Sequence, residues 1–199
     1  MMRIGVLASH GGSVLQAIMD ACASGEIPAR VALVLSNNSG ARALERARAE
    51  GIESIHLSSQ THPDSEALDQ AMVSALQSAS VDWVVLAGYM KKLGPKTLAA
   101  FHDRILNTHP ALLPKFGGAG FYGRRVHQAV LDAGETESGA TVHLVEGDYD
   151  TGPILAQVRV PVHAGDTVEA LEERVKVAER RLIITTLAEL STPKAAAGY

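Results

Sequence analysis

The chain has 199 residues, of which 46% are hydrophobic and 20% are charged, and its formal net charge at pH 7 is −4. These values predict one packed domain over residues 1–190 and a flexible tail at 191–199. The acidic balance and the lack of a long basic run argue against nucleic acid as a partner. No apolar run reaches the length of a membrane span, and the one cysteine, Cys22, has no partner for a disulfide or a CxxC pair. We therefore expect a cytoplasmic protein.

Strand and helix patterns alternate along the first 110 residues. Short apolar runs predict strands at 3–8, 31–35, 52–57, 83–87 and 104–107. Residues at helical spacing predict helices after each of the first three strands. Continuous apolar strands separated by helices are typical of a parallel sheet with both faces covered. The sequence therefore predicts an α/β fold, a three-layer sandwich with a mostly parallel, Rossmann-like sheet.

The pattern changes after about residue 137. Residues 140–145 and 154–160 predict neighbouring strands joined by a loop, which would give the sheet an antiparallel C-terminal portion. Asp166 followed by Glu169 has the spacing of a capping box, and apolar residues from Val168 to Leu182 then repeat at helical spacing. A last amphipathic helix is expected to begin at Asp166.

A glycine-containing loop, Ser9-His10-Gly11-Gly12-Ser13, joins the first strand to the first helix. Glycines let a ligand approach the backbone, and the free N–H groups of a helix start attract phosphate. The spacing fits neither GxGxxG nor a Walker loop, so it does not indicate a dinucleotide or ATP. A tight turn with a serine cap is the alternative interpretation.

A second polar segment, Asn107-Thr108-His109-Pro110, follows the fifth predicted strand. Open parallel sheets place ligands at this end of their strands. An amide donor and an imidazole two positions apart can point to the same side, where they suit an acyl-type reaction that forms an oxyanion. The alternative is a polar loop in which His109 serves as a cap.

The third segment, 147–153 (GDYDTGP), contains Asp148 and Asp150, either of which could hydrogen-bond a histidine and raise its pKa. Its composition is equally typical of a turn. His143 lies inside a predicted strand, where a histidine is usually a satisfied core or edge residue. His127 and the remaining histidines show no metal-ligand spacing, so we expect no metal.

Taken together, these segments resemble the glycinamide ribonucleotide formyltransferases, the folate-dependent enzymes of purine synthesis. The matching pieces, in family order, are SHGGSVLQAI, LAGYMKKL, LNTHPALLPKF, SGATVHLV, YDTGPILAQ and ERVKVAERR. The NxHPxLLP segment and the later DxGPI segment are specific to folate formyl transfer. The resemblance implies the formyltransferase fold, a domain of that kind over 1–190, and 10-formyltetrahydrofolate as co-substrate without a metal.

The resemblance also implies which residues form the site, and each role is assigned by the residue's position in these motifs. The catalytic set would be Asn107, His109 and Asp150, with Asp150 keeping His109 protonated while Asn107 and His109 stabilise the oxyanion. The acceptor and its phosphate would be held by Gly11, Gly12, Ser13, Val14, Lys176 and Glu179. The folate pocket would be lined by Met90, Lys91, Lys92, Leu93, Asn107, His143 and Asp150.

The chain departs from the family pattern in three places. Val14 stands where a bacterial pattern has asparagine, an arginine is missing just before Ser65, and the stretch Gly117–Arg125 is longer than in the shortest members. A formyltetrahydrofolate deformylase remains an alternative, as does a binding module on the same type of sheet. Either a monomer or a homodimer is compatible with the sequence.

Overall fold

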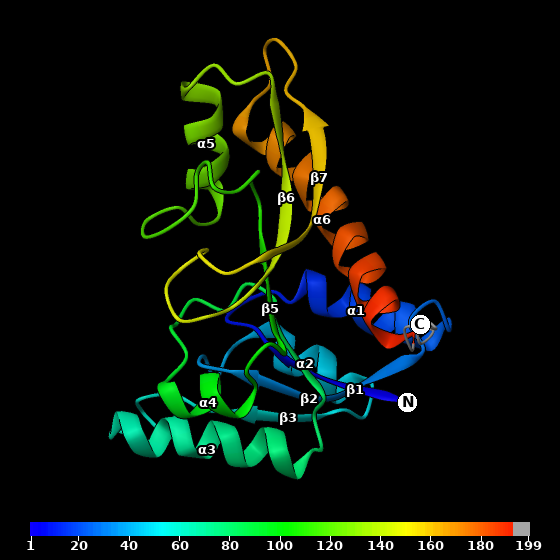
Figure 1. Cartoon of the computed structure of the whole chain (residues 1–199), viewed down its shortest axis with the longest axis vertical. Coiled ribbons are helices and arrows are strands. Elements are labelled where there is room, and N and C mark those ends of the chain that lie inside the picture. Colours follow the sequence, from blue (N-terminus) through cyan, green and yellow to red (C-terminus); the bar gives the residue numbers. More distant parts are fainter. Residues whose placement is uncertain (193–199) are drawn as a thin grey trace, which may run out of the picture.

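The computed structural model describes residues 1–192, and within them it has seven strands and six helices (Figure 1). The strands are β1 (Met2–Leu7), β2 (Ala29–Ser36), β3 (Glu53–His56), β4 (Trp83–Leu86), β5 (Ile105–His109), β6 (Glu137–Leu144) and β7 (Ile154–Pro161). The helices are α1 (Ser13–Ala23), α2 (Arg42–Ala49), α3 (Ser65–Ser78), α4 (Pro95–Ala100), α5 (Arg124–Asp132) and α6 (Val168–Ser191). Residues 193–199, which make up most of the expected tail, lie outside the described part.

All seven strands form one sheet in the order β3-β2-β1-β4-β5-β6-β7. The pairs from β3 to β5 are parallel, and β6 and β7 are antiparallel to their neighbours. The predicted mostly parallel sheet with an antiparallel C-terminal portion is confirmed. The order of the strands in the sheet changes direction between β1 and β4. Open α/β sheets bind ligands outside the carboxyl ends of their strands at such a point.

Helices cover the two faces of the sheet and give the molecule three layers. One core cluster packs α1, α2 and α6 against one face, and a second packs α3 and α4 against the other (Figure 1). A third, smaller cluster joins α5 to α6, β6 and β7 through Val130, Leu171 and Val175, among others. Burial of these apolar faces is the main source of stability and fixes the ends of the strands relative to one another.

The last helix begins differently from the prediction. Thr167 is its cap, and its hydroxyl accepts the amide hydrogen of Ala170 at 3.2 Å. Asp166 instead accepts the amide of His163 at 2.8 Å and forms an ion pair with Arg174 at 2.6 Å. The expected capping box at Asp166 is wrong because this ion pair holds its carboxylate away from the helix start.

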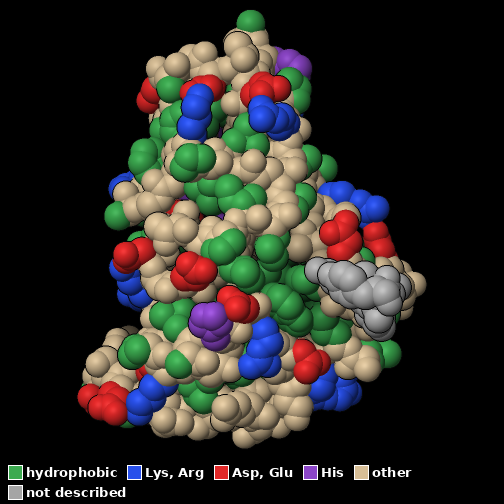
Figure 2. All heavy atoms as spheres, in the orientation of Figure 1, with side chains coloured by type: hydrophobic (Ala, Val, Ile, Leu, Met, Phe, Trp, Pro, Cys, Tyr) green, Lys and Arg blue, Asp and Glu red, His purple; other side chains and the backbone are tan. Residues whose placement is uncertain are grey.

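The described surface carries both signs of charge. Figure 2 shows acidic and basic side chains interspersed over one face, without a continuous basic block. No helix within residues 1–192 is long and apolar enough to cross a membrane. The absence of a nucleic-acid partner stays a prediction.

Candidate active site

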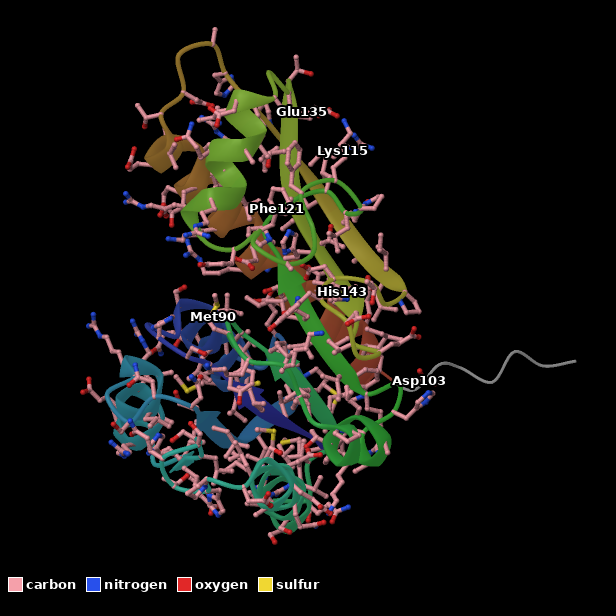
Figure 3. All side chains as sticks on the ribbon, turned by 90° about the vertical axis from the view of Figure 1, so that its left-hand side faces the viewer. Met90, Asp103, Lys115, Phe121, Glu135 and His143 are labelled. Atoms are coloured by element: carbon pink, nitrogen blue, oxygen red, sulfur yellow. The ribbon has the colours of Figure 1, made fainter. Side chains whose placement is uncertain are left out.

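A pocket of about 1010 Å³ opens at the carboxyl ends of β1, β4 and β5. Its walls come from loops and helices far apart in the sequence: residues 10–14, 86–93, 107–110, 118–123, 147–150 and the side of α6. Figure 3 shows Met90 and Phe121 on either side of the opening. Pockets of this size accommodate small organic ligands, and this one lies where the fold favours ligand binding.

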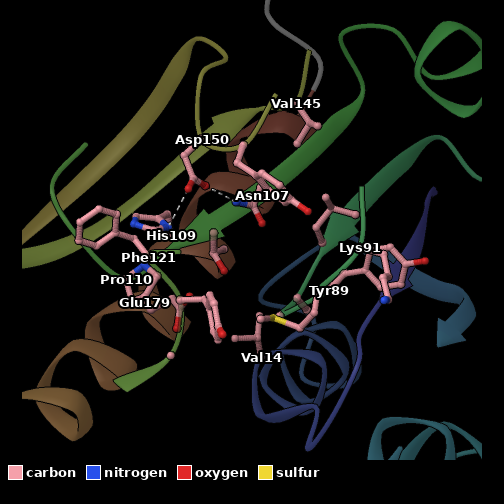
Figure 4. A pocket seen from close by; sticks show the side chains of 18 of the residues that line it. Val14, Tyr89, Lys91, Asn107, His109, Pro110, Phe121, Val145, Asp150 and Glu179 are labelled. Carbon is pink, nitrogen blue, oxygen red and sulfur yellow. Dashed lines mark hydrogen bonds and ion pairs between the residues drawn. The ribbon is translucent and has the colours of Figure 1, made fainter. Parts of the chain in front are cut away.

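Asn107, His109 and Asp150 meet inside this pocket. The first two lie on β5 two residues apart and therefore share one face of the strand. Asp150 Oδ1 accepts a hydrogen bond from Asn107 Nδ2 at 3.2 Å, and its Oδ2 lies 3.4 Å from His109 Nδ1 (Figure 4). The structure thus brings together the three residues expected to be catalytic.

Hydrogen-bond partners identify the donor nitrogens of His109 and His143, two of the histidines that line the pocket. His109 Nε2 donates to the carbonyl of Phe116 at 2.7 Å, which leaves Nδ1 to face Asp150. His143 Nδ1 donates to the carbonyl of Leu144 at 2.8 Å, so its Nε2 accepts from Asn107 Nδ2 at 3.0 Å. His143 therefore orients the Asn107 amide in the ligand-free site.

The pKa of His109 lies below its ordinary value. Burial lowers it most, since the residue is 4% exposed, and the charge of His143 lowers it further. The carboxylate of Asp150 and the carbonyl of Phe116 raise it, but by less than burial lowers it. Desolvation of the imidazolium thus opposes the effect of the Asp150 carboxylate, and the expectation that Asp150 keeps His109 protonated stays a prediction.

Asp150 itself is held as a carboxylate. Burial raises its pKa, but His143, whose Nε2 lies 3.5 Å from Oδ1, the charge of His109 and the amide of Gly118 together lower it below the ordinary value. Its backbone has φ 58°, a left-handed conformation that aspartate tolerates better than most residues. The site thus holds an ionised carboxylate 3.4 Å from the His109 imidazole.

The glycine loop forms the start of α1. Gly12 is the N-cap with φ 69°, and no side chain caps the helix, so the interpretation as a serine cap is wrong. A Cβ at Gly12 would lie 2.9 Å from that of Ala43, whereas one at Gly11 would meet nothing within 4 Å. Packing against α2 therefore explains Gly12, while Gly11 leaves open space beside the free N–H groups of the helix start. Ser13 and the buried Val14 complete this wall of the pocket.

Lys176 and Glu179 of α6 line the same pocket. Lys176 Nζ lies 2.6 Å from Glu172 one turn earlier. Burial raises the pKa of Glu179, against the opposing effect of the cations Arg180 and Lys176. Figure 4 shows Val14 and Glu179 on one side of the pocket, away from Lys91. The residues expected to hold the acceptor are therefore gathered at one end.

The segment expected to bind folate forms another wall. Met90, Lys91, Lys92 and Leu93 all line the pocket, although Leu93 is largely buried in the core. The hydroxyl of Ser9 accepts the amide hydrogen of Met90 at 2.8 Å and so ties this segment to the end of β1. Lys92 Nζ lies 2.8 Å from Asp148 Oδ1 and 5.0 Å from the ring centre of Tyr149.

Sequence reasoning missed several groups of the site. Gly118 donates its amide hydrogen to Asp150 Oδ2 at 2.9 Å. His127 of α5 lines the pocket, is 2% exposed and has no hydrogen-bond partner at Nδ1. Burial lowers the pKa of His127 most, and Lys176 and His109 add to this against Glu172. In the sequence, the extra glycines at 117–120 were the one sign of a backbone contact in the site. Composition cannot show which backbone amide faces a carboxylate.

Within residues 1–192, no three His, Cys, Asp or Glu side chains are grouped so that they could hold a metal ion. The absence of a metal from the reaction stays a prediction.

Comparison with known proteins gives one consistent result. Residues 2–187 match the formyl transferase family. The chain is 45% identical over 193 residues to phosphoribosylglycinamide formyltransferase of Mycobacterium tuberculosis, covering 96% of this chain and 85% of that protein. It is 41% identical over 182 residues to the protein of that name from Haemophilus influenzae, covering 92% and 84%.

A chloroplastic relative and a solved structure extend the comparison. The Arabidopsis thaliana phosphoribosylglycinamide formyltransferase is 42% identical over 92% of this chain, which spans 63% of that protein's length. The crystal structure of glycinamide ribonucleotide transformylase 1 from Symbiobacterium toebii has a TM-score of 0.89 and 43% identity, covering 96% of this chain and 88% of that one.

Proposed function

The chain belongs to the formyl transferase family, and we propose that it transfers a formyl group from 10-formyltetrahydrofolate to the amine of glycinamide ribonucleotide. This reaction serves purine synthesis. Its catalytic domain would be residues 1–190, with the cytoplasm as the proposed location.

One observation carries this proposal. The glycine loop, α6 and the 89–93 segment line one pocket, and Asn107, His109 and Asp150 lie together on another side of it (Figure 4). An anionic acceptor and a folate donor bound at these places would meet at the three polar groups. Such positioning of two reactants is a large part of what a group-transfer enzyme supplies.

The proposed reaction begins when the acceptor amine attacks the formyl carbon. The new C–N bond forms, the formyl oxygen becomes an oxyanion, and Asn107 and His109 donate hydrogen bonds to it. A developing anion beside His109 raises the proton affinity of the imidazole, which offsets the lowered pKa in the empty pocket. Asp150 accepts the amine proton directly or through water. The bond from carbon to folate N10 then breaks, and the proton ends on N10.

No covalent intermediate with the protein is needed. Cys22 belongs to α1 and packs against the core rather than lining the pocket, and burial raises the pKa of its thiol. Both features make it a poor nucleophile.

A deformylase is the second candidate, since water could replace the amine at the same catalytic groups. The free N–H groups at the start of α1, beside Gly11, and the ammonium of Lys176 line the pocket and could bind an acceptor phosphate. Hydrolysis does not need such a site, so these groups favour the transferase.

The experiment is to mix the purified protein with 10-formyltetrahydrofolate and follow the folate absorbance with and without glycinamide ribonucleotide. Tetrahydrofolate formation that requires the acceptor is the expected result. Formation without the acceptor would identify a deformylase. No formation in either mixture would favour a binding module or a different acceptor.

A further inference from the structure

The glycine-rich segment 117–123, called the strap below, crosses one side of the pocket with few contacts to hold it. Every residue from 119 to 125 is exposed. Gly118, Gly120 and Gly123 have φ values of 89°, 92° and 53°, which glycine adopts readily. Apart from the packing of the Phe121 ring against Phe116 and of the Tyr122 ring against Arg125, the position of the strap depends on contacts at its two ends.

The first end of the strap touches the proposed catalytic groups. The carbonyl of Phe116 accepts from His109 Nε2 at 2.7 Å, and the amide of Gly118 donates to Asp150 Oδ2 at 2.9 Å. Both contacts use backbone atoms, so their geometry follows the path of the chain. Displacement of the strap would disturb His109 and Asp150 together.

The second end is tied to α6 by Arg124. Its Nη1 lies 2.9 Å from Glu169 Oε1, and its Nε lies 3.1 Å from Glu172 Oε2. Glu172 is only 14% exposed, and its other oxygen lies 2.6 Å from Lys176 Nζ. Burial raises the pKa of Glu172, but Lys176 and Arg124 lower it by more, with a smaller contribution from His127. One ionised carboxylate is thus shared by Arg124 and Lys176.

We propose that Arg124 and Glu172 are a positioning pair for the formyl transfer: they clamp the strap to α6 and so keep the Phe116 carbonyl on His109 and the Gly118 amide on Asp150. The pair also links Lys176, at the acceptor end, to the catalytic carboxylate. This inference rests on the proposed function, because it assigns the pair a part in that reaction.

The clamp has a consequence for the pH dependence of the reaction. The amide of Gly118 stabilises the ionised form of Asp150, so its loss raises the pKa of that carboxyl. The charged groups around Asp150 are His109 and His143, and those around the clamp are Glu169, Lys176 and His127. A loosened strap should therefore lower kcat and move the acid limb of the kcat/KM profile to higher pH.

The test compares Arg124→Gln with Arg159→Gln. Arg159 is the matched control, because its Nη1 lies 2.6 Å from Glu137 Oε2 in an exposed ion pair that does not line this pocket. Arg124→Gln should lower kcat on the order of tenfold, as expected for one misaligned hydrogen bond to a charged group, and should move the acid limb to higher pH. Arg159→Gln should leave both unchanged, and Arg124→Lys should restore part of the loss.

Glu172→Gln provides a second variant. It should lower kcat similarly and also raise the KM for the acceptor, because Lys176 loses its partner. The double variant Arg124→Gln/Glu172→Gln should lower kcat no further than the worse single variant, since the two residues act through one contact.

Native kcat and a native pH profile in Arg124→Gln would overturn the inference. A change confined to the KM for the acceptor would also overturn it. The same holds for a loss of kcat that equals the fraction of unfolded protein in a melting curve. Amide hydrogen exchange of residues 116–123 tests the clamp without turnover. It should speed up in Arg124→Gln and not in Arg159→Gln, and unchanged exchange in Arg124→Gln would also refute the clamp. Lack of turnover in the unsubstituted protein would instead refute the proposed function.

Discussion

Asn107 has two N–H donors, and both are already in use in the empty pocket. One donates to His143 Nε2 and the other to Asp150 Oδ1. To stabilise an oxyanion, the amide must release one of these partners when the donor binds. These hydrogen bonds hold the side chain in place before the reaction, which reduces the reorganisation needed in the transition state.

Replacement of either donor tests this role at the scale of single residues. Asn107→Ala and His109→Ala should each lower kcat by roughly 100- to 1,000-fold, as the loss of one oxyanion donor does in other enzymes. Donor binding and thermal unfolding should be measured on the same samples to separate catalysis from folding. Near-native turnover in either variant would exclude the proposed role of that residue.

His127 supplies a prediction about stability. Its pKa in the folded protein is lowered by burial, so the unfolded chain binds a proton at a pH where the folded protein does not. Folding stability is therefore lost as pH falls below 6.5, the ordinary pKa of a histidine. His109 contributes in the same direction.

His127→Gln should weaken this acid sensitivity, since glutamine does not titrate. Melting temperatures between about pH 5 and 7.5 should fall less steeply for the variant than for the unsubstituted protein. His163→Gln, at an exposed position, is the control and should retain the original dependence. An unchanged slope in His127→Gln would contradict the assignment.

At the scale of elements, α4 depends on a side chain from α3. Asp69 is buried, and its carboxylate accepts the amides of Lys96 at 2.8 Å and Thr97 at 3.1 Å at the start of α4. Gly94 makes this approach possible, since a Cβ there would collide with Asp69. Because α4 directly follows the 89–93 segment, this contact also fixes one wall of the pocket.

Asp69→Ala should therefore destabilise the protein by about 2 kcal/mol, through buried amides left without an acceptor. It should also raise the KM for the folate donor more than the KM for the acceptor. Asp132→Ala is the control, because that exposed carboxylate bonds, among residues 1–192, only to Gln128 of its own helix. Equal unfolding free energies for the two variants would show that Asp69 is not needed to anchor α4.

The elements also show what the sequence could predict. Apolar runs located all seven strands to within a few residues, because buried strands need continuous apolar side chains. The helices α4 and α5 were not predicted, and α4 spans only six residues, too few for a clear helical period. The cap of α6 was misplaced by one residue because Asp166 has a stronger partner in Arg174.

At the scale of the whole molecule, long-range pairing assembles the site. The β5–β6 register places Asn107 directly opposite His143, and the loop after β6 then carries Asp150 back to them. The period of a strand suggested that Asn107 and His109 share a face, but no local pattern reveals a strand register. The contacts from Phe116 and Gly118 were equally hidden, because backbone atoms carry no sequence signal.

The most direct test of the account follows the formyl group itself. The protein is given 10-formyltetrahydrofolate labelled with ¹⁴C in the formyl carbon, together with glycinamide ribonucleotide, and the products are separated. The account predicts that the label passes to the amine of the acceptor and that little appears as formate. Label recovered mainly as formate, at a rate that does not depend on the acceptor, would contradict direct transfer in this pocket.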